Sequence, residues 1–245
     1  MTDNNYVTLI DHMGNDLSVV NAARVSFGKR VELDLSQYDD VEYEGCLTQI
    51  PILQDRDIKL IKYLAKHDHW SPFGHASMQF HIKAPVFVAR QLIKHQVGLV
   101  WNEISRRYVS DEPEFYTPEV WRGSAENKKQ GSSDEEIDIN PAIGSGPQML
   151  DDYQQALKSA KWTYERLLRL GVCPEQARMV LPQSMMTEWY WSGTVYAFAS
   201  ICNLRCKPEV QLETQMIANQ IDEQAKKLFP VSWEALRSRH IYVPC

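Results

Sequence analysis

The stretch from His75 to Gly98, HASMQFHIKAPVFVARQLIKHQVG, decides the fold because its apolar residues change their spacing at Pro85. Before Pro85, apolar residues at 76, 78, 80 and 82 alternate with polar ones, which is typical of a strand with one buried face. After it, apolar residues at 88, 89, 92, 93 and 97 recur at helical spacing, and Pro85 can serve as the first helical residue. We therefore predict a strand followed directly by a helix from Pro85 to about Val97, which Gly98 ends.

Outward from this stretch, the sequence is mostly helical in pattern. Apolar spacing and bounding Gly or Pro residues predict helices at 18–27, with Ser18 as N-cap, and at 55–67, 149–170, 174–182, 194–204 and 209–228. Residues 185–191 predict an aromatic strand, residues 29–50 have no clear period, and the polar residues 122–148 predict a long surface loop. No linker or repeat interrupts the chain. The prediction is a single α+β domain over residues 1–245, with an antiparallel sheet packed with helices.

Composition limits the class of protein without naming its chemistry. The chain is 44% hydrophobic and 24% charged, and it has no run of about 18 apolar residues that could span a membrane. Its net charge of −6 argues against a general nucleic-acid binder, which needs a basic surface. The N-terminus lacks the pattern of a signal peptide, and five cysteines, an odd number, do not suggest a disulfide framework. We expect a cytoplasmic protein without a membrane or nucleic-acid partner.

Polar side chains converge near the end of the predicted helix at 85–97. Arg90, Gln91, Lys94 and His95 lie opposite its apolar stripe, and the segment from Asn102 to Tyr108 follows within a few residues. Guanidinium forks, amides and a hydroxyl suit an anionic, hydrogen-bonding ligand such as a nucleotide. Spacing alone leaves open the simpler interpretation of a solvated helix face followed by a charged turn.

The same segment resembles the signature of the flavin-dependent thymidylate synthases, in which Arg-His-Arg is followed after about seven residues by Ser-Gly-Arg-Tyr or a variant. Here the signature stands as Lys94-His95-Gln96 and, further on, Ser105-Arg106-Arg107-Tyr108. The similarity extends to residues 12–18, 22–27, 66–75, 80–85, 176–182 and 203–205. It therefore covers most of the chain except residues 29–50 and the predicted loop after Arg122.

Several positions depart from the family pattern. Lys94 and Gln96 replace the two arginines beside the histidine, and one extra residue stands between His95 and Ser105. Tyr196 stands where an arginine is common, and Ser200 where an asparagine is common. Because these changes remove cations or planar forks, they alter the expected contacts with the flavin rather than the class of reaction.

The resemblance implies an enzyme that converts dUMP to dTMP, with methylenetetrahydrofolate as one-carbon donor, FAD as hydride carrier and NADPH as reductant. It assigns dUMP binding to Gln91, Lys94, Glu103, Ser105, Arg106, Arg107, Arg178 and Arg205. It assigns FAD binding to Ser71, Lys94, His95, Gln96, Asn102, Glu103, Thr194, Tyr196 and Ser200, and it places His69 beside the flavin ring or the folate.

Arg205 is expected to be catalytic, because a guanidinium stays protonated and can face negative charge on the uracil ring. Without the family context, a charge at a helix C-terminus would be its simpler role. The family also implies a homotetramer with shared active sites, in which Arg178 and Arg205 reach dUMP from a neighbouring subunit. Cys173 and Cys245 lack the Pro-Cys-His setting of the nucleophile of the ordinary thymidylate synthase.

Two other classes of function stay open as alternatives. His67, His69 and His75 could serve a metal-dependent hydrolase, although their spacing matches no recognised metal motif. Cys202 and Cys206 lack a second cysteine pair, so no metal ion is expected. A non-catalytic nucleic-acid-binding protein could use Trp70, Trp101 and the basic segment 106–108 for stacking and phosphate contact.

Overall fold

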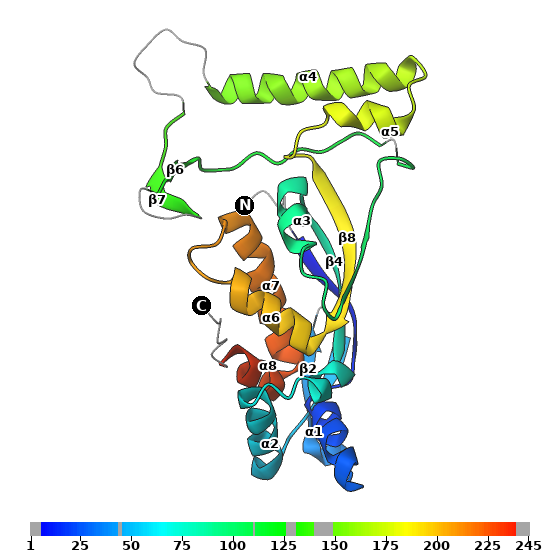
Figure 1. Ribbon diagram of the computed structural model, residues 1–245, viewed down its shortest axis with the longest axis vertical. Coiled ribbons are helices and arrows are strands. Elements are labelled where there is room, and N and C mark those ends of the chain that lie inside the picture. The colour runs from blue at the N-terminus through cyan, green and yellow to red at the C-terminus, as the bar shows by residue number, and fades with distance from the viewer. Residues whose placement is uncertain (1–5, 44–45, 110, 126–130, 140–148, 239–245) are drawn as a thin grey trace.

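A four-stranded antiparallel sheet forms the centre of the molecule (Figure 1). The computed structural model describes residues 6–43, 46–109, 111–125, 131–139 and 149–238. The strand order is β1 (Tyr6–Met13), β4 (Ser77–Pro85), β8 (Met186–Thr194) and β5 (Leu99–Glu103), with β1 and β5 at the edges. Every neighbouring pair in this sheet is antiparallel. The predicted α+β class is therefore confirmed.

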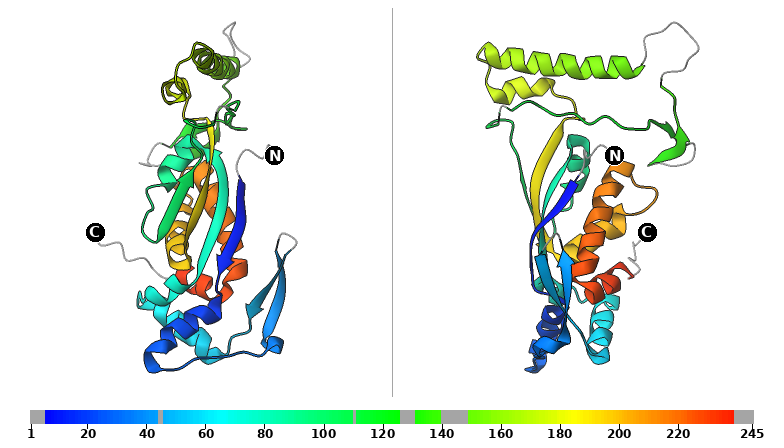
Figure 2. Two further views of the ribbon diagram at one scale, coloured as in Figure 1. Left: turned by 90° about the vertical axis from the view of Figure 1, so that its right-hand side faces the viewer. Right: turned by 180° about the vertical axis from the view of Figure 1, so that it is seen from behind.

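Three C-terminal helices cover one face of the sheet: α6 (Val195–Arg205), α7 (Leu212–Leu228) and α8 (Pro230–Arg237). In the left view of Figure 2 the sheet lies in front of α6 and α7. The alternation predicted for β4 buries Met78, Phe80 and Ile82 in the core against these helices. Its opposite face carries polar pairs, including Gln79 with Ser192 at 2.8 Å and His81 with Glu188 at 3.0 Å. The period of two thus sets which side chains enter the core.

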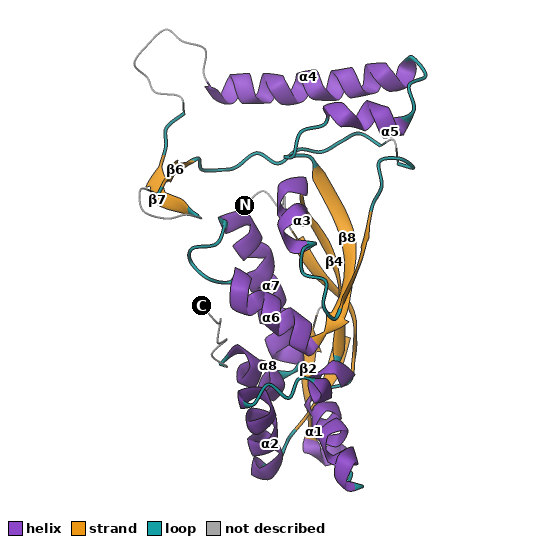
Figure 3. Ribbon diagram, viewed as in Figure 1, coloured by secondary structure: helices purple, strands orange, loops and turns teal. Residues whose placement is uncertain are grey.

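Smaller elements extend the sheet layer at its two ends (Figure 3). At one end lie α1 (Asp16–Arg24), α2 (Asp55–Lys66), the 3₁₀ turn η3 (Ser71–His75) and the hairpin of β2 (Tyr38–Tyr43) and β3 (Cys46–Pro51). At the other end lie α3 (Val86–Leu92), α4 (Met149–Arg169), α5 (Pro174–Ala177) with η4 (Arg178–Val180), and the hairpin of β6 (Arg122–Ser124) and β7 (Ser132–Glu136). A further 3₁₀ turn, η1 (Val25–Phe27), follows α1, and η2 (Leu35–Gln37) precedes β2.

The helix predicted from Pro85 to Val97 is too long. It ends at Leu92, and the chain turns back through Gly98, whose φ of +74° suits glycine, into the edge strand β5. The predicted stripe fails beyond Leu92 because Ile93 and Val97 are 38% and 92% exposed. The strand at 99–103 was not predicted, because LVWNE, three apolar residues followed by two polar ones, has neither the period of two nor the helical period.

Two further predictions need correction. Asn15, not Ser18, caps α1: its side chain accepts hydrogen bonds from the backbone N–H groups of Leu17 and Ser18, while the Ser18 hydroxyl accepts one from Asn15 N. The predicted loop at 122–148 contains the β6–β7 hairpin, whereas residues 126–130 and 140–148 lie outside the described residues. The helices predicted at 55–67, 149–170, 194–204 and 209–228 are confirmed to within a few residues.

Candidate active site

Gln91 and Lys94 lie at the end of α3 and line a cavity of about 340 Å³. Its other lining residues are Gly131, Arg205, Val210 and Gln211. Arg205 is the last residue of α6, and Gln211 precedes the first turn of α7. The cavity therefore brings the predicted nucleotide-binding helix end together with the predicted catalytic arginine, which lies more than a hundred positions away in sequence.

The side-chain amide of Gln91 is held at both ends. Its Nε2 donates to Gln211 Oε1, and its Oε1 accepts from the hydroxyl of Thr214 at 3.2 Å. Thr214 is fully buried. Both residues belong to the start of α7 and carried no signal in the sequence, because their partner is remote along the chain. They fix the orientation of Gln91 at the cavity.

His95 orients Arg205 within the same site. The Nε of Arg205 donates to Nε2 of His95 at 3.1 Å, so this ring nitrogen acts as an acceptor and the histidine is neutral. Burial, and then the positive charge of Arg205, lower the pKa of His95 from its ordinary value of 6.5. Arg205 is therefore held in place by an uncharged imidazole. Because His95 does not neutralise it, the positive charge of Arg205 remains available to the cavity.

A second cavity of about 330 Å³ contains another part of the predicted set. Glu103, Arg106 and Arg178 line it, together with Arg90 and residues 181–183 and 185–187. Glu103 is held by the hydroxyl of Thr187 at 2.7 Å and by the indole N–H of Trp101 at 3.3 Å. Within one chain, Arg178 therefore lines a different cavity from Arg205, and the eight residues assigned to dUMP do not form a single pocket.

Ser105 and Arg107 stand on the turn that follows β5. Arg107 Nε donates to the Ser105 hydroxyl at 3.2 Å, and its guanidinium lies 5.0 Å from the centre of the Tyr108 ring. Arg107 and Tyr108 are both exposed. This turn presents a cation, a hydroxyl and an aromatic face to solvent beside the cavity lined by Arg106.

The residues assigned to FAD come from η3, the turn after α3, β5, the end of β8 and α6. Gln96 and Asn102 are exposed on the turn after α3 and on β5. Thr194 joins this group because its backbone N–H donates to Gly98 O at 3.1 Å. Its hydroxyl caps α6 by accepting from Ala197 N, while Ser200 donates to the carbonyl of Tyr196 at 2.9 Å.

Ser71 and His69 lie in and next to η3, which contacts α6. Both are exposed, and the ring of His69 lies 5.9 Å from Tyr63 and 6.4 Å from His67. Among the described residues, His67, His69 and His75 do not form a close group of metal-binding atoms. Trp101 stacks on the buried Trp189 at 4.3 Å, so it supports the sheet instead of offering a free stacking face.

Comparison with known proteins gives a consistent result. The family model described as "Thymidylate synthase complementing protein" matches residues 8–231. A flavin-dependent thymidylate synthase from Thermus thermophilus is 38% identical over 233 residues, which cover 95% of this chain and 76% of the relative. Another, from Kosmotoga olearia, is 36% identical, with 94% and 89% coverage.

Solved structures give the same result. The UMP/dUMP methylase PolB from Streptomyces cacaoi, bound with 5-Br dUMP, has a TM-score of 0.73 and 30% identity, and the match covers 96% of this chain and 95% of that one. The same methylase bound with 5-Br UMP has a TM-score of 0.71. No helix in the described part of the chain is both long enough and apolar enough to cross a membrane.

Proposed function

This chain belongs to the flavin-dependent thymidylate synthase family, and we propose that it methylates dUMP to dTMP with methylenetetrahydrofolate as one-carbon donor and NADPH as reductant. The observation that carries the proposal is the joint placement of Gln91, Lys94 and the His95-oriented Arg205 at one cavity. A uracil ring that gains negative charge needs a fixed cation nearby, and Arg205 meets this need.

The hydrogen-bond donors at this cavity and on the surface beside it are of the kinds that can bind a flavin dinucleotide. Lys94 supplies a cation at the cavity, and the exposed Gln96 and Asn102 supply amides on the adjoining surface. FAD bound there would carry the hydride that completes the methyl group. The neutral His95 and the hydroxyl-bearing Thr194 would orient it, with Tyr196, Ser200, Ser71 and Glu103 as further neighbours. His69 would lie beside the flavin ring or the folate.

The phosphate group of dUMP would be bound by Ser105, Arg106, Arg107 and Arg178. We propose that chains assemble into a cytoplasmic homotetramer in which Arg178 or Arg205 completes the site of a neighbour. Two features support this: Arg178 and Arg205 line different cavities of one chain, and α4 with the residue that follows it exposes large apolar side chains, because Met149, Trp162 and Leu170 are 58%, 53% and 71% exposed.

We expect the purified protein to be yellow, with an oxidised-flavin spectrum that bleaches when NADPH is added. Incubation with dUMP and methylenetetrahydrofolate should then yield dTMP, detected by chromatography. UMP in place of dUMP, in a parallel reaction, tests which nucleotide is preferred. A colourless preparation that takes up no FAD and forms no product from either nucleotide would contradict the proposal.

The pH profile of turnover should have an acid limb with a midpoint below 6.5. Because the folded pKa of His95 is lowered, the neutral imidazole that accepts from Arg205 persists below the ordinary value of 6.5 and is lost only as the pH falls further. The His95→Gln variant should lack this limb. His81→Gln, on the polar sheet face outside both cavities, is the matched control and should keep it. A limb centred at or above pH 6.5 in the wild type would exclude His95 as its source.

A further inference from the structure

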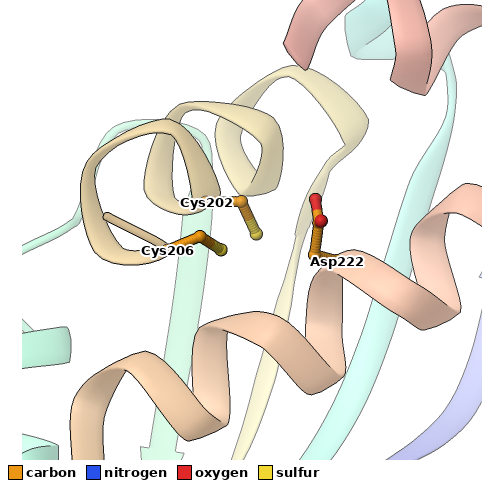
Figure 4. Close-up of side chains that lie close together, drawn as sticks. All are labelled: Cys202, Cys206 and Asp222. Atoms are coloured by element: carbon orange, nitrogen blue, oxygen red, sulfur yellow. The ribbon is translucent and has the colours of Figure 1, made fainter. Parts of the chain in front are cut away.

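Where α6 packs against α7, three side chains carry metal-binding atoms: Cys202 of α6, Cys206, which caps the C-terminus of α6, and Asp222 of α7 (Figure 4). Their two sulfurs and a carboxylate oxygen all lie within 4.8 Å of one another. Across the described ranges of the chain, this is the one group of three possible ligands that meets this closeness. None of the three belongs to the proposed dUMP or FAD set.

The possible ligands come from the C-terminal end of α6 and from α7. Cys202 lies in the last turn of α6, and Cys206 caps the helix one turn later, with its backbone N–H bonded to the carbonyl of Cys202, so the two side chains are neighbours. Asp222 faces them from α7. A tetrahedral Zn²⁺ ion with Zn–S bonds of about 2.3 Å separates its ligand atoms by roughly 3.5–3.8 Å. The three side chains therefore need to approach by about one ångström to bind such an ion, within the reach of small rotations.

Groups around Asp222 hold it in the way that ligating carboxylates are usually held. Its Oδ1 accepts from the indole N–H of Trp233 at 2.8 Å and from Arg237 Nε at 2.7 Å. Both bonds go to Oδ1, so Oδ2 can bind a cation. Arg237 also donates to the side chain of Asn203, which fixes it in place.

The charges of the group balance once a divalent ion is included. Two thiolates and one carboxylate carry −3, so a divalent ion leaves −1, and the guanidinium of Arg237 neutralises it. A neutral cluster suits this location, because Cys202 is fully buried and an unpaired charge there would be costly.

The two thiols differ in their burial: Cys202 is fully buried and donates to the carbonyl of Ala218 at 3.5 Å. Cys206 is half-buried, so an ion would enter from its side, and Cys202 would release its proton on binding.

We propose that Cys202, Cys206 and Asp222 form a binding site for a thiophilic divalent cation of the Zn²⁺ class, with an open fourth position. This proposal departs from the sequence-based expectation that the chain binds no metal ion. The sequence signal was weak because the third ligand lies on another helix. Cys206 directly follows Arg205, so a bound ion would tie the end of α6 to α7 beside the proposed catalytic arginine.

Co²⁺ is the probe that tests the site, since it replaces Zn²⁺ and its visible and charge-transfer bands report tetrahedral geometry and thiolate ligands. The full chain, reduced with a phosphine and stripped of metal, should bind one Co²⁺ per chain with sulfur-to-cobalt bands that added Zn²⁺ abolishes. Removal of a residue that only hydrogen-bonds to a metal ligand typically lowers metal affinity by about 10–100-fold. Loss of a ligand itself should cost more, so we expect Cys206→Ser and Asp222→Asn each to lower the affinity for Co²⁺ by more than about 100-fold. Cys173→Ser, an exposed cysteine outside the cluster, is the matched control and should bind like the wild type.

Two results would overturn the proposal. One is a wild-type protein that shows no sulfur-to-cobalt bands, or a Cys206→Ser variant whose Co²⁺ affinity and spectrum equal those of the wild type. The other is a reduced protein that binds no Co²⁺ while air oxidation joins Cys202 to Cys206, shown by a mass loss of two hydrogens in the proteolytic peptide that contains both residues. If Asp222→Asn does not fold, Cys206→Ser alone decides, because its side chain is half-buried and the substitution is nearly isosteric. The flavin spectrum and the turnover of dUMP in the same samples report on the proposed function independently.

Discussion

Arg205→Ala is expected to reduce dUMP turnover by at least about 10²–10³-fold, the usual cost of removing one group that stabilises charge in a transition state. The guanidinium lines the cavity of Gln91 and Lys94, and its Nε bond to His95 at 3.1 Å fixes its direction. Alanine removes the charge and the donor together. The flavin spectrum should stay largely intact, because Arg205 belongs to the proposed nucleotide set.

Two companion variants sharpen this experiment. Arg205→Lys keeps the positive charge but loses the planar fork, so it should recover part of kcat and leave the His95 contact unmade. Arg169→Ala, an exposed arginine at the end of α4 outside both cavities, is the control for loss of a surface charge and should be near wild type in turnover. Normal turnover in Arg205→Ala would remove the assigned role.

Trp189→Ala should lower the free energy of unfolding by about 3–5 kcal/mol, the range for deleting a large buried aromatic side chain. Trp189 is 1% exposed, and Trp101 of the edge strand β5 stacks on it at 4.3 Å. Because Trp101 also holds Glu103, the loss of this support should weaken dUMP binding as well. Urea unfolding followed by circular dichroism measures the first effect, and titration with dUMP measures the second.

Trp162→Ala provides the comparison for Trp189→Ala. Trp162 lies on α4, is 53% exposed and packs over Arg166, so its removal should cost less than about 1 kcal/mol. Equal destabilisation by the two variants would mean that stacking on Trp189 does not support β5.

The parts of the fold with a strong apolar period could be predicted from the sequence. The strand β4 and the helices α2, α4 and α7 carry such a period, so their burial and their spacing agree. In α6, by contrast, apolar residues occur on nearly every side, so its sequence indicates a buried helix but not which face packs on the sheet. The hairpins β2–β3 and β6–β7 and the strand β5 could not be predicted. They are short, polar or exposed, and long-range pairing rather than local pattern determines them.

The sequence predicted which residues belong to the candidate site better than it predicted the contacts that hold them. The resemblance to the family indicated Gln91 and His95 in the signature and Arg205 in the segment 203–205, and the structure places them at or beside one cavity. Sequence reasoning missed Gln211 and Thr214, which orient Gln91, and Thr187, which holds Glu103. These partners come from other helices and strands, and only the three-dimensional packing brings them together.

The continuous pairing of β5 has a consequence for how this chain can differ in length from its relatives. Leu99 to Glu103 pair with Gly193 to Trp189 without a bulge, so side chains alternate strictly between the two faces of the strand. One residue inserted within the strand would move every side chain beyond it to the opposite face, including those of Asn102 and Glu103. The extra residue between His95 and Ser105 must therefore be absorbed outside the strand, in the turn that Gly98 closes or at Ile104. We therefore expect differences in length between this chain and its relatives to fall at the two ends of β5 and not within it.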